Sequence, residues 1–229
     1  MANLCIIPAR GGSLRIPRKN IREFLGKPII AYSIETAIKS GIFDEIMVST
    51  DNQEIAEIAK SYSAKVPFLR SEKNSSNDAT TFDVIKEVVT HYNIKNQLFQ
   101  HICCLYPCAP FVKSEDLISG LEKLVSGDYD SVFPIVSYDF PIERALKVYD
   151  NGNVYFNDHT YSLRRSQDLE KYFHDAGQYY WMQVDSLSKG AIVTNNSGYM
   201  KISRMNFQDI DDITDWNLAE LKYQLLERK

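Results

Sequence analysis

The sequence lacks the features that mark secreted, membrane-spanning or general nucleic-acid-binding proteins. Its first residues run directly into an apolar segment, with no charged region before an apolar core, so we expect no signal peptide. No stretch approaches the roughly 18 apolar residues that a membrane span needs. The formal net charge of −4 disfavours binding to a nucleic-acid backbone. We therefore expect a cytoplasmic protein without a membrane or nucleic-acid partner, in which any anion site is local.

Cysteine is scarce, and its placement disfavours a disulfide framework. The cysteines are Cys5, Cys103, Cys104 and Cys108. Three of them cluster and two are adjacent, which is poor geometry for disulfide pairs. A metal site from His101, Cys104 and Cys108 would lack a second Cys/His pair with metal-binding spacing. Thiols buried on a strand are the simpler interpretation.

Two common nucleotide-binding motifs are also absent. No G-x-G-x-x-G spacing occurs, which makes a nicotinamide-dependent oxidoreductase a weak hypothesis. No G-x-x-x-x-G-K-S/T occurs either, so the sequence contains no P-loop. Because no linker rich in Pro, Gly or Ser interrupts the chain, we predict a single domain over residues 1–229.

Short apolar runs alternate with amphipathic segments along the first part of the chain. The apolar runs predict strands at 3–7, 45–49, 66–69, 102–105 and 130–136. The amphipathic segments predict helices at 28–40, 52–62, 81–92 and 114–125, and a last helix follows at 214–228. That last helix is expected to turn four apolar residues inward: Trp216, Leu218, Leu221 and Leu225. This alternation predicts an α/β fold of three layers, with helices on both faces of a mixed, mostly parallel sheet.

The rhythm changes after about residue 140. Residues 147–149 and 152–156 predict a hairpin, and the aromatic segment 178–184 predicts a further strand. We therefore expect about 140–190 to form a small β-rich lobe for substrate binding or dimerisation.

The segment 8–20, directly after the first predicted strand, carries the strongest functional signal. It reads PARGGSLRIPRKN. Four cations stand in it: Arg10, Arg15, Arg18 and Lys19. Gly11 and Gly12 let the backbone approach a ligand closely with its N–H groups exposed. Cations beside exposed amides suit a polyphosphate, and ligands bind at the carboxyl ends of strands in such sheets. A merely solvated basic loop has little need of Gly-Gly.

A second signal is the acidic segment Asp209-Ile210-Asp211-Asp212. Carboxylates two residues apart in an extended segment point to the same side. Such a pair suits Mg²⁺, which binds through one or two carboxylates together with substrate phosphates. The alternative is capping of the following helix by acidic residues. The residues alone leave these two interpretations even.

Residues 6–20 closely resemble the signature loop of the CMP-sugar-acid synthetases, the cytidylyltransferases for sialic acid and its relatives. The resemblance implies nucleotide binding by Ala9, Arg10, Gly11, Gly12, Ser13 and Asn20. It implies catalytic roles for Lys19 and Arg10, with Lys19 neutralising the triphosphate during transfer. Leu14 stands where the family commonly has Lys, which keeps a nucleotide-sugar-binding protein without catalysis as an alternative.

The resemblance extends through the nucleotide half of the chain. Arg70 and the segment 77–81 are similar to the family's base-recognition segment, which implies that Arg70, Asp78 and Thr81 bind the nucleotide. The family's metal ligands stand in an Asp-x-Asp, which implies that Asp209 and Asp211 hold Mg²⁺ and that Asp211 is catalytic. Capping of the next helix is a compatible role for 77–81.

The sugar half looks most like the pseudaminic acid branch of the family. The segments 139–145, 164–168 and 174–179 carry this likeness. Tyr106 replaces a Gln, and His174 replaces the Arg of the sialic acid enzymes. The implied sugar-binding residues are Tyr106, Arg165, Gln167, His174, Gln178 and Tyr179.

The family resemblance implies a fold like that of the nucleotide-diphospho-sugar transferases and a homodimer. It implies transfer of CMP from CTP to a nonulosonic acid, with Mg²⁺ as cofactor and a product that supplies glycosylation. N-acetylneuraminic acid or an eight-carbon sugar acid is the alternative acceptor. No side chain stands out as a general base.

Overall fold

The structure is a computed structural model that describes residues 2–13 and 15–228. The prediction attached to Leu14 lies outside these residues. Within them, no helix combines the length and the apolar character that crossing a bilayer requires.

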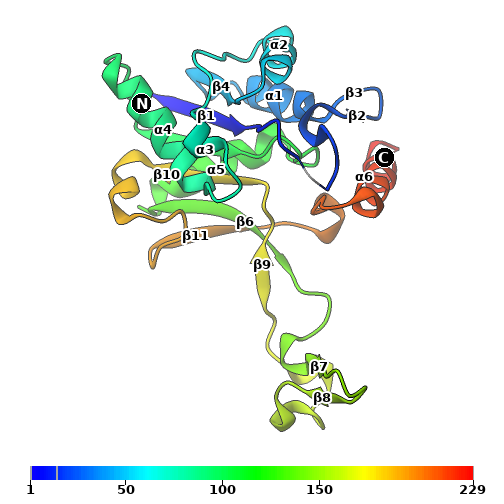
Figure 1. Cartoon of the computed structure of the whole chain (residues 1–229). Coiled ribbons are helices and arrows are strands. Elements are labelled where there is room, and N and C mark those ends of the chain that lie inside the picture. The colour runs from blue at the N-terminus through cyan, green and yellow to red at the C-terminus, as the bar shows by residue number, and fades with distance from the viewer. Residues whose placement is uncertain (1, 14, 229) are drawn as a thin grey trace.

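A mixed sheet forms the centre of the molecule (Figure 1). Its strands are β1 (Asn3–Pro8), β4 (Glu45–Ser49), β5 (His101–Leu105), β6 (Ser131–Ser137), β9 (Phe173–Asp175), β10 (Tyr179–Gln183) and β11 (Ser197–Lys201). They are ordered β11-β6-β10-β5-β1-β4, and β9 pairs with β6. Strand β1 is parallel to β4 and β5, and β11 is parallel to β6. Only β10 and β9 run against these strands. The predicted mixed, mostly parallel sheet is confirmed.

Helices cover both faces of the sheet. They are α1 (Ile29–Ser40), α2 (Gln53–Ser61) and α5 (Ser114–Ser126) on one face and α4 (Thr81–Ile94) on the other. Successive residues of β1 point to opposite faces. Cys5 and Ile7 accordingly pack with Ile34 of α1, whereas Ile6 packs with Ile85 of α4. The three predicted layers follow from this alternation.

The last helix, α6 (Ile213–Glu227), lies at the end of the molecule beside β2 (Glu23–Phe24) and β3 (Lys27–Pro28). Trp216 packs edge-on against Phe24, with ring centroids 5.6 Å apart. The prediction that Leu218, Leu221 and Leu225 point inward is wrong, because these side chains are exposed. The helix face that carries Trp216 and Ala219 packs against a cluster that includes Phe24. The face that carries the three leucines therefore points to solvent.

Between β6 and β9 the chain leaves the sheet and forms a projecting lobe (Figure 1). The predicted hairpin is present there as β7 (Leu146–Val148) paired with β8 (Val154–Phe156). The lobe also holds the 3-10 helices η2 (Ile142–Arg144), η3 (His159–Tyr161) and η4 (Ser166–Asp168). It returns to the sheet at β9, so it is shorter than the predicted 140–190.

One predicted strand is missing. Residues 66–69 form no strand, and the chain makes only an isolated bridge between Met47 and Lys65 before turning away. The remaining short elements are α3 (Glu72–Ser75), η1 (Lys19–Ile21), η5 (Val184–Lys189) and η6 (Arg204–Asn206). The sequence does not predict these elements or the strands β9 and β11, because they are too short or too polar to show a regular apolar pattern.

Candidate active site

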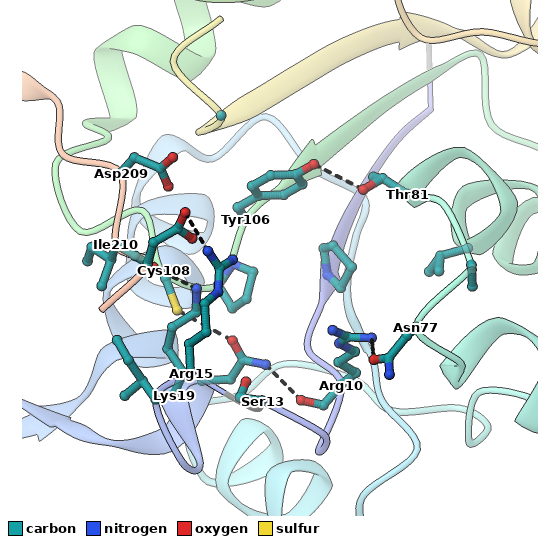
Figure 2. Close-up of a pocket in the computed structure, with 18 of the residues that line it drawn as sticks. Arg10, Ser13, Arg15, Lys19, Asn77, Thr81, Tyr106, Cys108, Asp209 and Ile210 are labelled. Carbon is teal, nitrogen blue, oxygen red and sulfur yellow. Dashed lines mark hydrogen bonds and ion pairs between the residues drawn. The ribbon is translucent and has the colours of Figure 1, made fainter. Parts of the chain in front are cut away.

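A cavity of about 570 Å³ opens beside the carboxyl ends of β1 and β5 (Figure 2). The basic loop after β1 forms one wall, and the segment leading into α4 forms another. The turn after β5, the residues before β10 and the acidic segment before α6 complete the lining. Both sequence signals, the basic loop and the acidic segment, therefore meet in one place.

The basic loop takes its path from the turn after β4. The Ala9 N–H donates to the Ser49 carbonyl oxygen at 2.9 Å, and the Gly11 N–H donates to Asp51 Oδ1 at 2.8 Å. A Cβ atom on Gly11 would lie 3.0 Å from Asn52 Cβ, tighter than ordinary contact. A larger residue at this point would require the Asn52 side chain to shift by a few tenths of an ångström.

Asn20 closes the loop from inside. Its side chain is buried, and Nδ2 donates to the Arg10 carbonyl oxygen at 2.9 Å. Its Oδ1 accepts a hydrogen bond from Cys108 Sγ at 3.4 Å. Asn20 thus joins the two ends of the loop to the turn after β5.

Cys5, Cys103 and Cys104 are buried on strands, as predicted, whereas Cys108 is half-buried in the turn after β5. Burial raises the pKa of Cys108 to about 12, although Lys19 opposes this effect, so the thiol is neutral. His101 Nδ1 lies 2.9 Å from Asn3 Oδ1 and is engaged there. Among residues 2–13 and 15–228, no three His, Cys, Asp or Glu side chains form a group that could hold a metal ion. The thiol metal site considered from the sequence has no support.

Three loop cations line the cavity and reach its opposite walls (Figure 2). Arg10 donates to Asn77 Oδ1 at 2.9 Å, toward α4. Lys19 Nζ donates to the Ile210 carbonyl oxygen at 2.8 Å, and Arg15 forms an ion pair with Asp211 at 2.7 Å. Three positive charges therefore surround one polar space, which suits a ligand with several anionic groups.

Arg18 differs from these three cations. Its backbone is left-handed, with φ of 57°, and its side chain forms an ion pair with Glu54. It does not line the cavity. Arg18 is therefore a natural control for the other cations of the loop.

Arg70 places a further positive charge at the cavity wall. Only 7% of the residue is exposed. Its Nε donates to Ser49 Oγ at 3.0 Å, and its Nη2 donates to the Ser49 carbonyl oxygen. Burial lowers the pKa of Arg70, although an arginine stays protonated in a protein. Both bonds go to neutral groups of Ser49. Arg70 also forms no ion pair with another described residue, so its charge is not neutralised by a carboxylate in direct contact.

The start of α4 forms the wall near Arg70. Thr80 is the N-cap and forms a capping box with Asp83, so the predicted capping role of this segment is confirmed. Thr81 Oγ1 lies 3.0 Å from the Tyr106 hydroxyl oxygen (Figure 2). This hydrogen bond joins a predicted nucleotide-binding residue to a predicted sugar-binding residue.

The carboxylates of the acidic segment point in two directions, one toward α6 and two toward the cavity. Asp212 caps α6 and accepts from the N–H groups of Thr214 and Asp215 at 2.7 and 3.0 Å. Asp209 and Asp211 instead line the cavity. Burial, and after it the charge of Asp211, raises the pKa of Asp209. Asp212 therefore has the capping role, whereas Asp209 and Asp211 present their carboxylates to the cavity.

Comparison with known proteins identifies the family. A family model described as cytidylyltransferase matches residues 4–212. Pseudaminic acid cytidylyltransferase of Campylobacter jejuni is 41% identical, over 98% of this chain and 97% of its own length. The chain belongs to the cytidylyltransferase family. CMP-N,N'-diacetyllegionaminic acid synthase of Legionella pneumophila is 37% identical over 98% of this chain and 97% of its own length.

A solved structure shares the fold of this cytidylyltransferase family member. CMP:2-keto-3-deoxy-manno-octonic acid synthetase, complexed with CTP, matches with a TM-score of 0.71 and 16% identity over the whole of both chains. The predicted relation to nucleotidyltransferase folds is confirmed at the level of architecture.

The cavity brings together most of the site residues that the cytidylyltransferase resemblance implies. They are Arg10, Ser13, Lys19, Asn20, Arg70, Thr81, Tyr106, Gln178, Asp209 and Asp211. Gln178 is fixed by a hydrogen bond from Nε2 to the Asn206 carbonyl oxygen at 2.8 Å. Ala9, Gly11, Gly12 and Asp78 are not among the lining residues, although Asn77 and Ala79 are.

Four implied sugar-binding residues lie outside the cavity. Tyr179 is buried in the core on the α5 side and donates to the Asp116 carbonyl oxygen at 3.1 Å. Gln178 lies in the bend directly before β10 and lines the cavity, whereas Tyr179, the first residue of β10, points into the core. Arg165 and Gln167 belong to the projecting lobe. His174, on β9, packs edge-on against Phe207, with ring centroids 5.3 Å apart.

The structure also adds lining residues to which the family resemblance assigned no binding role. Arg15, Asn77, Cys108 and Gln208 all line the cavity. Arg15 was visible as a loop cation, but nothing in its spacing distinguished it from Arg18. Asn77 and Gln208 are single polar residues whose positions only the fold reveals.

Proposed function

We propose that this chain transfers CMP from CTP to the anomeric hydroxyl of a nonulosonic acid, with pseudaminic acid as the preferred acceptor, and releases pyrophosphate. The observation that carries this proposal is the cavity that Arg10, Arg15 and Lys19 line together with Asp209 and Asp211. The 41% identity to a pseudaminic acid cytidylyltransferase supports the choice of acceptor.

In this proposal the nucleotide lies along the basic loop. Arg70 and Thr81 contact its base and ribose end, and the loop cations contact its triphosphate. The anomeric oxygen attacks the α-phosphorus in line, the bond from that phosphorus to the bridging oxygen breaks, and pyrophosphate leaves. The hydroxyl proton passes to solvent. Catalysis of such a transfer rests on positioning and charge neutralisation, which the convergent cations provide.

The residues of the cavity fit a divalent cation, and we propose Mg²⁺ held by Asp209 and Asp211. The pKa of Asp209 is raised partly by the charge of Asp211, a repulsion that a bound cation would relieve. The Arg15–Asp211 ion pair shows that a positive group can reach this carboxylate. Two carboxylates leave the remaining positions to phosphate oxygens and water, which is the set that Mg²⁺ favours. The ion would neutralise charge on the triphosphate.

We propose that the projecting lobe binds a second copy of the chain. It exposes large apolar side chains, with Phe140, Val148 and Leu163 each more than four-fifths exposed. Such side chains on one extension favour burial in an interface. Arg165 and Gln167 lie on this lobe, away from the cavity of their own chain.

Sedimentation or light scattering is expected to give about twice the 26.3 kDa of one chain. Leu163→Asp should shift the protein toward the monomer, because a charge would have to be buried. The matched control is Leu98→Asp, at an exposed position outside the lobe. A monomeric parent protein, or equal behaviour of the two variants, would contradict the lobe interface.

The acceptor is tested by pyrophosphate release with CTP and Mg²⁺ in the presence of one sugar acid at a time. Pseudaminic acid is expected to give a kcat/KM at least about tenfold above N-acetylneuraminic acid and an eight-carbon sugar acid, since a mispaired polar group in a site costs at least that factor. A preference for N-acetylneuraminic acid would keep the reaction and overturn the interpretation of Tyr106 and His174.

A further inference from the structure

The acidic segment that carries Asp209 and Asp211 lacks regular secondary structure. It lies within residues 207–212, between η6 and α6, and no strand pairs with these residues. Its two carboxylates nevertheless need a fixed direction to serve a cation in the cavity. The contacts that supply this direction come from α6.

Asp215, in the first turn of α6, holds the C-terminal end of the segment. Its Oδ2 accepts from the N–H groups of Asp211 and Asp212 at 3.0 and 3.1 Å. Its Oδ1 accepts from Gln208 Nε2 at 3.3 Å. The bond to Asp212 belongs to the capping box of the helix, whereas the bond to Asp211 goes beyond what capping requires.

Lys222, two turns further along α6, holds the N-terminal end. Its Nζ donates to the Phe207 carbonyl oxygen at 2.9 Å, to Gln208 Oε1 at 2.9 Å and to the Arg204 carbonyl oxygen at 3.4 Å. These three bonds use all the donors of an ammonium group. Gln208 links Lys222 to the metal-ligand candidate Asp209, because its Nε2 donates to the Asp209 carbonyl oxygen at 3.0 Å.

We propose that Lys222 and Asp215 are positioning residues for the carboxylates of Asp209 and Asp211, and this inference rests on the proposed Mg²⁺ site. Neither side chain lines the cavity. Together they grip the segment from both ends and connect it to a helix packed through Trp216. Residues of this kind, one layer behind metal ligands, set ligand direction and metal affinity.

An effect of the Lys222 charge and an effect of its hydrogen bonds predict opposite changes in cation affinity when Lys222 is replaced. If Lys222 acted only through its charge, its loss would strengthen cation binding, since one repelling charge would be gone. If Lys222 acts by holding the segment, its loss weakens cation binding because the carboxylates lose their direction. The charged groups with the largest effect on Asp209 are Asp211, Lys19 and Asp215.

The test is binding of Mn²⁺, a spin probe for the Mg²⁺ site, to the full chain with CTP present, measured by electron paramagnetic resonance. Lys222→Met keeps the aliphatic stem and is expected to weaken Mn²⁺ binding by about tenfold. Lys222→Arg, which keeps charge and donors, should restore most of the affinity. Lys123→Met is the matched control, since Lys123 also donates to a carbonyl, that of Tyr199, far from the cavity in sequence and fold.

Thermal unfolding of the same variants separates positioning from loss of the fold. Equal melting temperatures for Lys222→Met and Lys123→Met, with a Mn²⁺ defect only in the former, support the proposal. Unchanged or tighter Mn²⁺ binding in Lys222→Met overturns it. The variant Asp211→Ala separates failure of the proposed metal site from failure of the positioning role. If Asp211→Ala abolishes Mn²⁺ binding and Lys222→Met leaves it unchanged, the metal site stands and only the positioning role fails. If Asp211→Ala binds Mn²⁺ normally, both fail.

Discussion

Asp211→Ala is expected to lower Mg²⁺-dependent turnover by about 1,000-fold, equivalent to about 4 kcal/mol of transition-state stabilisation. The carboxylate lines the cavity beside Asp209, and its loss would remove one of two anionic ligands from the proposed cation site. Turnover should be measured over a wide range of Mg²⁺ concentration, so that weakened metal binding is separated from a lower maximal rate.

The fold should survive this change. The only side-chain partner of Asp211 within the described residues is Arg15, and both side chains are well exposed. An exposed ion pair contributes at most about 1 kcal/mol, so the melting temperature should fall by only a few degrees. Asp212→Asn is the control, since Asn also caps helices well and Asp212 points to α6 rather than into the cavity. Near-normal turnover in Asp211→Ala would end the metal assignment.

Lys19→Met is expected to lower kcat by about 100- to 1,000-fold, with a smaller change in KM for CTP. The Lys19 ammonium lies in the cavity, 2.8 Å from the Ile210 carbonyl oxygen, where it can oppose charge that develops on the leaving pyrophosphate. Removal of one such preorganised donor commonly costs this factor. Steady-state kinetics with CTP varied at saturating sugar acid gives both constants.

The neighbouring residue Arg18 provides the control for Lys19. Arg18→Gln removes a charge from the same loop, but its partner Glu54 lies outside the cavity. Its turnover should stay within about twofold of the parent protein, because surface charges act weakly through solvent. If Arg18→Gln were as damaging as Lys19→Met, the loop would act through its overall charge and not through placed cations.

The sequence predicts the sheet and its covering helices well, because their signals are local. The strand at 45–49 is found with the same bounds as β4, and the helix at 114–125 becomes α5 with one residue more. Strand direction is not a local property, and the aromatic segment 178–184 gave no sign that β10 runs against its neighbours. The outward leucines of α6 show the same limit, since a helix can carry two apolar stripes and pack only one.

The site follows the same division between local and long-range information. The basic loop and the acidic pair are recognisable as segments, yet only the fold reveals that Lys19 bonds to Ile210, 191 residues away. The predicted strand at 178–184 already conflicts with sugar binding by both Gln178 and Tyr179, because adjacent residues of an extended segment point to opposite sides. The positions of Arg165 and Gln167 on the lobe depend on how the chain leaves the sheet, which no local pattern encodes.

The most direct test of cytidylyl transfer is to incubate the protein with Mg²⁺, pseudaminic acid and CTP that is radiolabelled at its α-phosphate. We predict that the label moves into a CMP–sugar product and that one pyrophosphate is released for each product formed. Binding of CTP without release of pyrophosphate, or label that stays in CTP, would contradict the account and would favour a nucleotide-sugar-binding protein that does not catalyse transfer.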